Sequence, residues 1–126
     1  MRLLGELALR VNDLGKMLAF YRDVVGLEVW REYEDCVFFR IADGVEGHPQ
    51  LLVLFDRNIV VGPATSTIDH FAFVIGLEEY DEWRRQLERS GMQVRPSEPG
   101  FQWRALFITD PEGNTAEFVC HDPSIE

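Results

Sequence analysis

The feature that most constrains the fold is an internal repeat, which aligns the first half of this 126-residue chain with the second half. Three pairs of segments align along the chain: residues 7–11 with 71–75, residues 26–29 with 91–94, and residues 40–43 with 107–110. The offset between them grows slowly, from 64 to 65 to 67 residues. Small changes in loop length leave such a drift in a duplicated unit, so the sequence predicts two copies of one supersecondary motif.

Each half reads as a strand, a helix and then three further strands. Alternation of apolar and polar residues predicts the first strand over residues 6–11. Apolar residues at helical spacing predict a helix over residues 14–25, which Asn12 or Asp13 caps and Gly26 ends. The remaining predicted elements are strands at 27–33, 36–43, 50–55, 70–75, 92–98, 103–110 and 114–120, a helix at 77–91, and a loop at 44–49.

This order of elements predicts an α+β fold in which two βαβββ modules form a single domain over residues 1–126. Module one covers about residues 4–56, a connector covers about 57–67, and module two covers about 68–121. A chain of this length is long enough to bury a substantial hydrophobic core as one domain.

The charge balance excludes several classes of partner. The chain carries 22 acidic and 12 basic residues, a net charge of −10. Such a field repels phosphate backbones and anionic lipid surfaces, so we expect no nucleic-acid partner and no membrane partner. No apolar run approaches the ~18–20 residues that span a bilayer. Cys36 and Cys120 fit no metal or disulfide spacing, which favours buried free thiols and a cytoplasmic location.

Four polar residues in predicted strands form two pairs under the repeat. Glu6 aligns with His70 at an offset of 64, and Gln50 aligns with Glu117 at an offset of 67. If the two modules face each other, equivalent positions converge, and a nitrogen, two carboxylates and a carboxamide then surround one point. This hard donor set with a charge of −2 suits a divalent metal ion (Mn, Fe, Ni, Co, Zn or Mg). Each residue alone also has an ordinary explanation, and Glu117 could be the solvent-facing residue of an edge strand.

Three segments of the sequence resemble the vicinal oxygen chelate superfamily, which includes glyoxalase I, bleomycin-resistance proteins and extradiol dioxygenases. They are "DLGKMLAFYRDVVGLEV", "DHFAFVI" and "ITDPEGNTAEFV". The resemblance extends from Glu6 to about Val119. It implies that the two βαβββ modules form an open, cup-shaped mixed sheet with the helices outside. It also implies a small-molecule substrate and a homodimer.

The resemblance further implies roles for the four polar residues. Metal-binding members take their ligands from the first and last strands of each module, and His70, Glu117 and Gln50 match such positions. Glu6 stands where those members usually carry His. The implied function is a metal-dependent lyase, isomerase or dioxygenase that chelates a small oxygenated substrate, with Glu117 as the catalytic proton carrier. The alternative is a metal-free, small-molecule or drug-binding protein of the bleomycin-resistance type, which the substitution at Glu6 favours.

Aromatic and basic residues that could line the implied cup are candidates for contact with the substrate. The sequence suggests aromatic residues to line the site and arginines to bind an anionic group of the substrate. These candidates are Phe38, Phe101, Trp103, Phe107, Arg40 and Arg104. The sequence does not identify the substrate itself.

Overall fold

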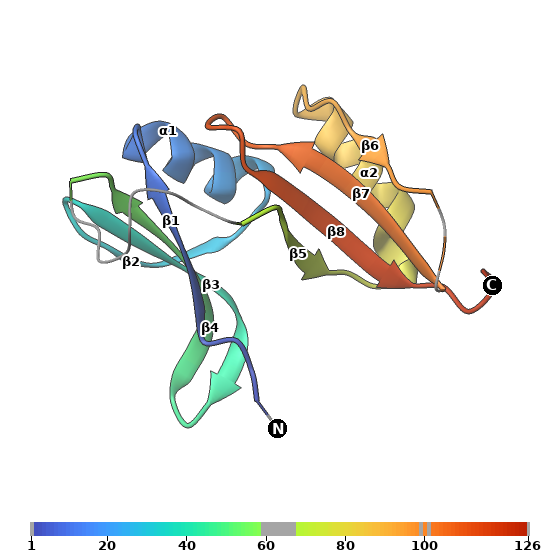
Figure 1. The fold of residues 1–126 in the computed structure, drawn as a ribbon, viewed down its shortest axis with the longest axis horizontal. Helices are drawn as coiled ribbons and strands as arrows, with labels where there is room; N and C mark the ends of the chain where they lie inside the picture. Colours follow the sequence, from blue (N-terminus) through green and yellow to red (C-terminus); the bar gives the residue numbers. More distant parts are fainter. Residues whose placement is uncertain (1, 59–67, 99, 101, 126) are drawn as a thin grey trace. The chain divides into compact units, whose positions relative to one another are not determined.

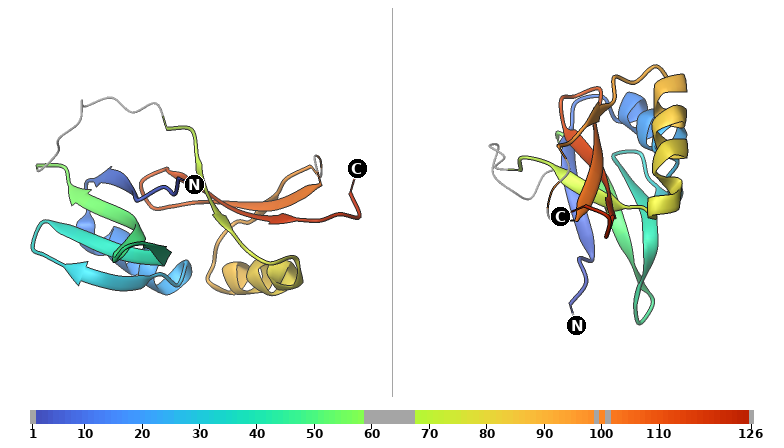
Figure 2. Two further views of the ribbon diagram at one scale, coloured as in Figure 1. Left: turned by 90° about the horizontal axis from the view of Figure 1, so that it is seen from below. Right: turned by 90° about the vertical axis from the view of Figure 1, so that its right-hand side faces the viewer.

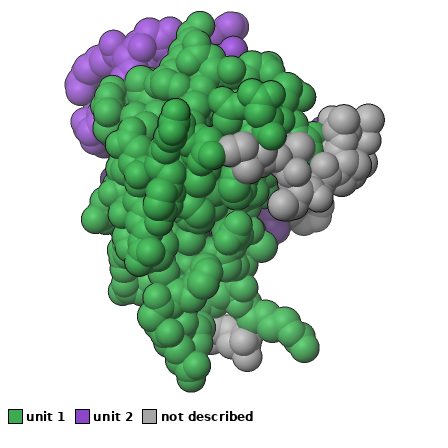
Figure 3. All heavy atoms as spheres, turned by 90° about the vertical axis from the view of Figure 1, so that its left-hand side faces the viewer, with its two compact units in different colours: residues 1–66 green, residues 67–126 purple. Residues whose placement is uncertain are grey.

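The computed structural model describes residues 2–58, 68–98, 100 and 102–125. The chain divides into two compact units, Met1–Ser66 and Thr67–Glu126, which Figure 3 shows in separate colours. Each unit is one βαβββ module with its own four-stranded mixed sheet, as the repeat predicts (Figure 1). Phe101 and most of the predicted connector lie outside the described residues.

Module one follows the predicted order of elements closely. Its strands are β1 (Glu6–Val11), β2 (Glu28–Glu32), β3 (Cys36–Val45) and β4 (His48–Asp56), in the sheet order β1-β4-β3-β2. β1 runs parallel to β4, and the other neighbours are antiparallel. Asp13 caps helix α1 (Leu14–Ala19) by accepting a 3.0 Å hydrogen bond from the Lys16 N–H. The helix continues as a π-helical turn, η1 (Phe20–Val24), which the sequence did not predict.

Module two repeats this topology. Its strands are β5 (Phe71–Val74), β6 (Arg95–Pro96), β7 (Trp103–Thr109) and β8 (Thr115–His121), in the sheet order β5-β8-β7-β6. A 3₁₀ turn, η2 (Leu77–Glu79), leads into helix α2 (Tyr80–Arg89). Figure 2 shows α2 lying along one side of this sheet. β6 is only two residues long, shorter than the strand predicted over 92–98.

One surface of each sheet packs against the helix of its own module. In module one the buried ring of Tyr21 lies 6.3 Å from the ring of Phe39. In module two the ring of Trp83 stacks on the ring of Phe118, with centroids 4.7 Å apart. Because successive residues of a strand point to opposite surfaces, every second residue lies on the other side of the sheet, here called the helix-free face.

The last strand of each module lies in the interior of its sheet. β8 pairs with β5 on one side and with β7 on the other, so Glu117 has Ala72 and Phe107 as its cross-strand neighbours. Glu117 is therefore not on an edge strand, and that explanation for its position is wrong. Its neighbours in sequence, Ala116 and Phe118, are buried on the helix side.

The hairpin between β3 and β4 differs from the prediction. Instead of a loop over 44–49, the strands continue to Val45 and resume at His48, with a two-residue turn between them. Both turn residues, Glu46 and Gly47, have positive φ (51° and 85°), as a tight hairpin turn requires. Gly44 permits the close pairing, because a Cβ there would lie 1.8 Å from the carbonyl oxygen of His48.

The corresponding hairpin of module two has a longer turn, organised by a buried aspartate. Asp110 Oδ1 accepts hydrogen bonds of 2.9 Å from the backbone N–H groups of Glu112 and Asn114. Its Oδ2 accepts a 2.8 Å bond from Asn114 Nδ2, and Gly113 adopts a φ of 89°. The sequence "DPEGN" is thus explained by the formation of this turn.

The two cysteines are free thiols, as the sequence predicts. Cys120 is buried and Cys36 is half-buried, and burial raises the pKa of both thiols. A raised pKa keeps a thiol protonated near neutral pH, so neither cysteine is an activated nucleophile. Among the residues that the structure describes, no helix has the length and apolar character needed to cross a membrane.

Candidate metal centre

Module two brings two of the four predicted ligands together. His70 immediately precedes β5, and Glu117 lies in the middle of β8. The distance between His70 Nε2 and Glu117 Oε2 is 3.4 Å. The Glu117 side chain is 15% exposed and the His70 side chain is 42% exposed, so the pair is open to a ligand from one side. The sequence prediction that these two residues are neighbours is therefore consistent with the fold of this module.

The orientation of the His70 ring is set by a residue that the sequence reasoning missed. His70 Nδ1 lies 2.7 Å from Asp69 Oδ2. Because an ionised carboxylate only accepts hydrogen bonds, Nδ1–H is the donor to Asp69, and Nε2 is the ring nitrogen that faces Glu117 and that a metal could bind. Histidines that bind a metal through Nε2 usually donate Nδ1–H to a carboxylate or carbonyl in this way. The signal available in the sequence was the acidic residue directly before His70.

The geometry of this pair fits a divalent ion. Two ligand atoms 3.4 Å apart correspond to two metal–ligand bonds of about 2.1 Å that meet at about 110°. Across residues 2–58, 68–98, 100 and 102–125, no group of three or more His, Cys, Asp or Glu side chains gathers at one point. Module two by itself therefore supplies two donors, which is fewer than a complete coordination shell.

Strand pairing in module one shows what stands at the position equivalent to Glu117. Ala8 aligns with Ala72 in the repeat; Ala8 pairs with Val53, whereas Ala72 pairs with Glu117. Pairing with the third strand of each module gives the same equivalence of Val53 and Glu117, because Phe38 pairs with Val53 and Phe107 pairs with Glu117. Module one therefore carries an apolar valine where module two carries its half-buried carboxylate.

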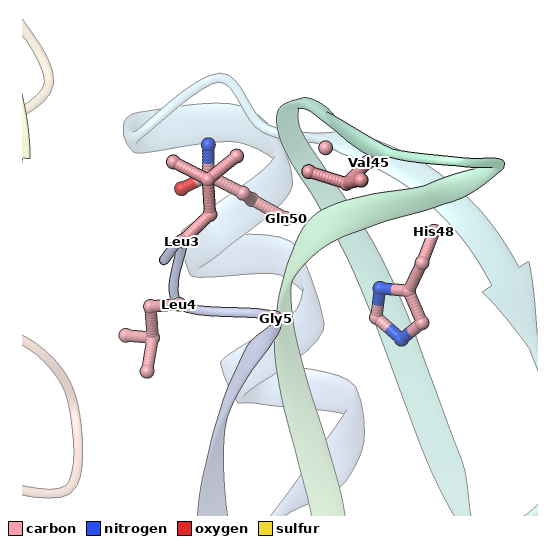
Figure 4. Close-up of a pocket in the computed structure, with 7 residues that line it drawn as sticks. Leu3, Leu4, Gly5, Val45, His48 and Gln50 are labelled. Atoms are coloured by element: carbon pink, nitrogen blue, oxygen red, sulfur yellow. The ribbon is translucent and has the colours of Figure 1, made fainter. Parts of the chain in front are cut away.

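Gln50 occupies a different place from the one the repeat predicted. Gln50 pairs with Ala42 on β3. Along β4 it lies three residues before Val53 and directly before Leu51. Since neighbouring strand residues point to opposite surfaces, Gln50 points away from Leu51. Its Nε2 donates a 3.3 Å hydrogen bond to the Asp43 carbonyl, and Figure 4 shows its side chain directed toward Leu3. The predicted equivalence of Gln50 and Glu117 is wrong, and the register gives no support to Gln50 as a ligand.

The strand register supports the alignment of Glu6 with His70 that the sequence repeat predicted. Glu6 is the first residue of β1, its side chain is exposed, and it pairs with Leu51 on β4. This position corresponds to His70, which directly precedes the first paired residue of β5. Module one therefore offers one carboxylate and no histidine at its two equivalent positions.

The candidate substrate-binding residues fall on both surfaces of the sheets. The register places Phe38 and Arg40 on the helix-free face of module one. It places Trp103, which is 58% exposed, on the helix-free face of module two with Glu117. Arg104, one residue later, points to the opposite surface. The prediction for Phe101 lies outside the described residues.

Arg104 has a structural partner on the helix side of module two. Its Nε and one terminal nitrogen lie 3.1 Å and 3.0 Å from Asp122 Oδ2, and its guanidinium lies 5.4 Å from the Tyr80 ring centroid. Asp122 also accepts hydrogen bonds from the Ser124 hydroxyl (2.6 Å) and the Ser124 N–H (3.0 Å). These bonds fasten the segment after β8 to the sheet, so the guanidinium that was predicted to bind an anionic group of the substrate is paired with Asp122 on the surface opposite Glu117.

We expect Asp122 to make the stability of the fold sensitive to acid. The hydrogen bonds from Ser124, and then those from Arg104, hold the pKa of Asp122 below its ordinary value. Such a carboxylate stabilises the fold fully above the unfolded-state pKa of about 3.9, and this contribution is lost as the pH falls through the folded-state pKa. In urea unfolding, the difference between wild type and Asp122→Asn should be largest near neutral pH and vanish in strong acid. Ser124→Ala should show a smaller loss with the same pH dependence. A difference that is constant with pH would contradict this assignment.

The architecture defines a class of protein: a single chain with two equivalent βαβββ modules and a half-buried His–carboxylate pair on the helix-free face of one of them. The chain belongs to the Glyoxalase/Bleomycin resistance protein/Dioxygenase superfamily, whose sequence model matches residues 3–118. This assignment agrees with the resemblance noted from the sequence.

Individual relatives are distant. The chain is 22% identical over 125 residues to a metallothiol transferase, FosB, of Staphylococcus haemolyticus, covering 98% of this chain and 85% of the relative. It is 30% identical over 113 residues to a manganese-dependent 2,3-dihydroxybiphenyl 1,2-dioxygenase of Geobacillus genomosp. 3, covering 86% of this chain and only 33% of that protein. Among solved structures, a lactoylglutathione lyase from Agrobacterium tumefaciens is similar with a TM-score of 0.70 and 27% identity, covering 94% of this chain and 92% of that one.

Proposed function

We propose that this protein is a metal-dependent enzyme that acts on a small oxygenated substrate. His70 and Glu117 are the proposed ligands in module two, and Glu6, aligned with His70 by the repeat, is the proposed third ligand. The observation that carries the proposal is the 3.4 Å His70–Glu117 pair, with Asp69 fixing the histidine tautomer. The names of two relatives, a metallothiol transferase and a manganese-dependent dioxygenase, also support a metal.

The donor set determines which ions are suitable. One imidazole nitrogen and two carboxylates form a hard site that carries two negative charges. Mn²⁺, Fe²⁺, Co²⁺, Ni²⁺, Zn²⁺ and Mg²⁺ suit such a site better than Cu(I), which prefers sulfur ligands. When bound, a divalent ion supplies positive charge to polarise oxygen atoms of the substrate.

The chain's own residues provide orientation and proton transfer. Asp69 keeps His70 in one tautomer, so that Nε2 remains the donor atom. Phe107, which pairs with Glu117 across the strands, makes a T-shaped contact with His70, in which the ring centroids are 6.0 Å apart. Glu117 is the proposed acceptor of a substrate proton, because its carboxylate is 15% exposed and lies beside His70 on the helix-free face.

Elemental analysis of protein purified without an affinity tag tests the proposal. We expect one equivalent of a divalent metal per chain, or one saturable equivalent after metal removal and titration with Mn²⁺, Fe²⁺, Ni²⁺ or Zn²⁺. The titration should be followed by a direct signal, such as the electron paramagnetic resonance of free Mn²⁺. Absence of any stoichiometric binding across these ions would exclude the metal-dependent function.

A metal-free binding protein is the second candidate function. One specific observation favours it: at its two equivalent positions, module one carries Glu6 in place of a histidine and Val53 in place of a carboxylate. A module that lacks metal donors can still bind an oxygenated small molecule on its own helix-free face. This candidate predicts that no divalent ion binds and that ligand binding is unchanged by a chelator.

A further inference from the structure

We infer that module one contains a binding subsite for the carboxylate or phosphate group of a small molecule, formed by Arg40, Trp30 and His48 beside the β3–β4 hairpin. These residues line a cavity of about 300 Å³, together with Asp43 and backbone of the hairpin. This volume is at the lower end of the range found for small-molecule sites. All of the lining residues belong to module one.

Arg40 provides the positive charge of the subsite. Its guanidinium donates a hydrogen bond to the carboxylate of Asp43, three residues later on β3. The Asp43 side chain is 93% exposed, whereas the Arg40 side chain is 32% exposed. An ion pair with such an exposed carboxylate contributes little free energy, because the carboxylate is well solvated when unpaired. An oxyanion of a ligand can therefore displace Asp43 and accept the same charge-assisted hydrogen bonds from the guanidinium.

Trp30 supplies a flat apolar surface beside this charge. The guanidinium carbon of Arg31 lies 4.1 Å from the centroid of the Trp30 ring, in a cation–π contact. Arg31 does not line the cavity, so Arg40 is the guanidinium that an anionic group of the ligand can reach there.

His48 adds a hydrogen-bonding group with a defined role. Its Nδ1 lies 2.7 Å from the carbonyl oxygen of Pro49. Because a carbonyl oxygen only accepts, Nδ1–H is the donor, and Nε2 is the ring nitrogen left to bond with a hydroxyl group of a ligand. Gly44 and Gly47 contribute no side chains to the cavity, and Gly44 cannot be replaced without a clash with the His48 carbonyl. The expected ligand is a small, flat or hydroxylated acid.

If the protein is the enzyme proposed above, this subsite would bind the anionic end of its substrate. The role of the subsite in turnover therefore rests on the proposed function, but its ability to bind an anion does not. Binding of an anion to module one requires neither His70 nor Glu117. The test is therefore carried out on metal-free protein, so that failure of the metal site and failure of the subsite give different results.

The experiment is a titration of the ¹⁵N-labelled protein, in the presence of a chelator and at constant ionic strength, with benzoate in one arm and inorganic phosphate in the other. We expect the indole N–H signal of Trp30 and the amide signals of Gly44 and Gly47 to shift together and saturate in at least one arm, which identifies the preferred oxyanion. Asp43→Asn should tighten binding about threefold by removing the competing carboxylate. Arg40→Gln should weaken it about tenfold.

Two controls separate this result from general effects. Arg84→Gln removes an equally ion-paired arginine from α2 and should leave binding unchanged. His70→Ala removes a proposed metal ligand and should also leave it unchanged. Partial unfolding would weaken anion binding, so it cannot produce the higher affinity that we expect for Asp43→Asn. Shifts that do not saturate in either arm, or equal affinity in wild type, Asp43→Asn and Arg40→Gln, would overturn the proposal.

Discussion

Glu117→Gln is expected to lower the affinity for a divalent metal by at least about 100-fold, beyond the 10–100-fold that outer-shell partners of metal ligands contribute. The substitution keeps the shape of the side chain and removes the negative charge next to His70 Nε2, 3.4 Å away. The measurement is a competitive Mn²⁺ titration of metal-free protein.

Two further variants make this prediction specific. Glu98→Gln removes an exposed carboxylate from the same module and should leave metal affinity unchanged. Asp69→Asn should reduce affinity about tenfold, because a neutral amide is a weaker orienting partner for His70 Nδ1–H than a carboxylate, while Nε2 is kept. Equal affinity of the wild type and Glu117→Gln would show that Glu117 is not a ligand, even if the protein still binds metal elsewhere.

Phe118→Ala is expected to cost about 3–5 kcal/mol of the free energy of unfolding. Phe118 is 1% exposed and stacks on Trp83, and its ring also lies 5.6 Å from that of Phe73. Removing the ring leaves a cavity between β8 and α2 that neither element can fill without shifting. Since a domain of this size is stable by about 5–15 kcal/mol, a large part of its stability would be lost. Urea unfolding followed by circular dichroism measures the change.

The matched control for Phe118 lies on the same sheet. Val74→Ala truncates a side chain that is 85% exposed on β5 and should change the free energy of unfolding by less than about 1 kcal/mol. If Phe118→Ala costs no more than Val74→Ala, the stacked contact with Trp83 does not organise the core of module two.

Much of the fold is predictable because its local signals agree with one another. Alternation along residues 6–11 and 114–120, the cap at Asp13 and the glycine after the first helix all correspond to observed elements. The β3–β4 hairpin was missed because Gly44 and Pro49 are typical of loops. In this structure Gly44 serves a different purpose, since it allows two strands to approach closely.

The candidate site was only partly predictable, for a reason of geometry. His70 and Glu117 could be recognised from sequence because each follows a distinct local pattern. The repeat aligned Glu117 with Gln50 because each follows an aspartate by seven residues. This alignment was wrong, since it assumed that the two hairpin turns have the same length. Asp110 lies in the turn of its hairpin, whereas Asp43 lies within β3. Only the parallel pairing, which sequence spacing does not reveal, identifies Val53 as the true counterpart.

The same parallel pairs have a consequence for how the chain folds. Glu6 pairs with Leu51 and Phe71 pairs with Ala116, so in each module the paired residues are separated by the same 45 positions. Neither sheet can be completed until its final strand is available, because that strand bonds to both the first and the third. Closing two loops of equal length carries an equal entropic cost. During synthesis, all strands of module one are therefore available for pairing before the last strand of module two has emerged.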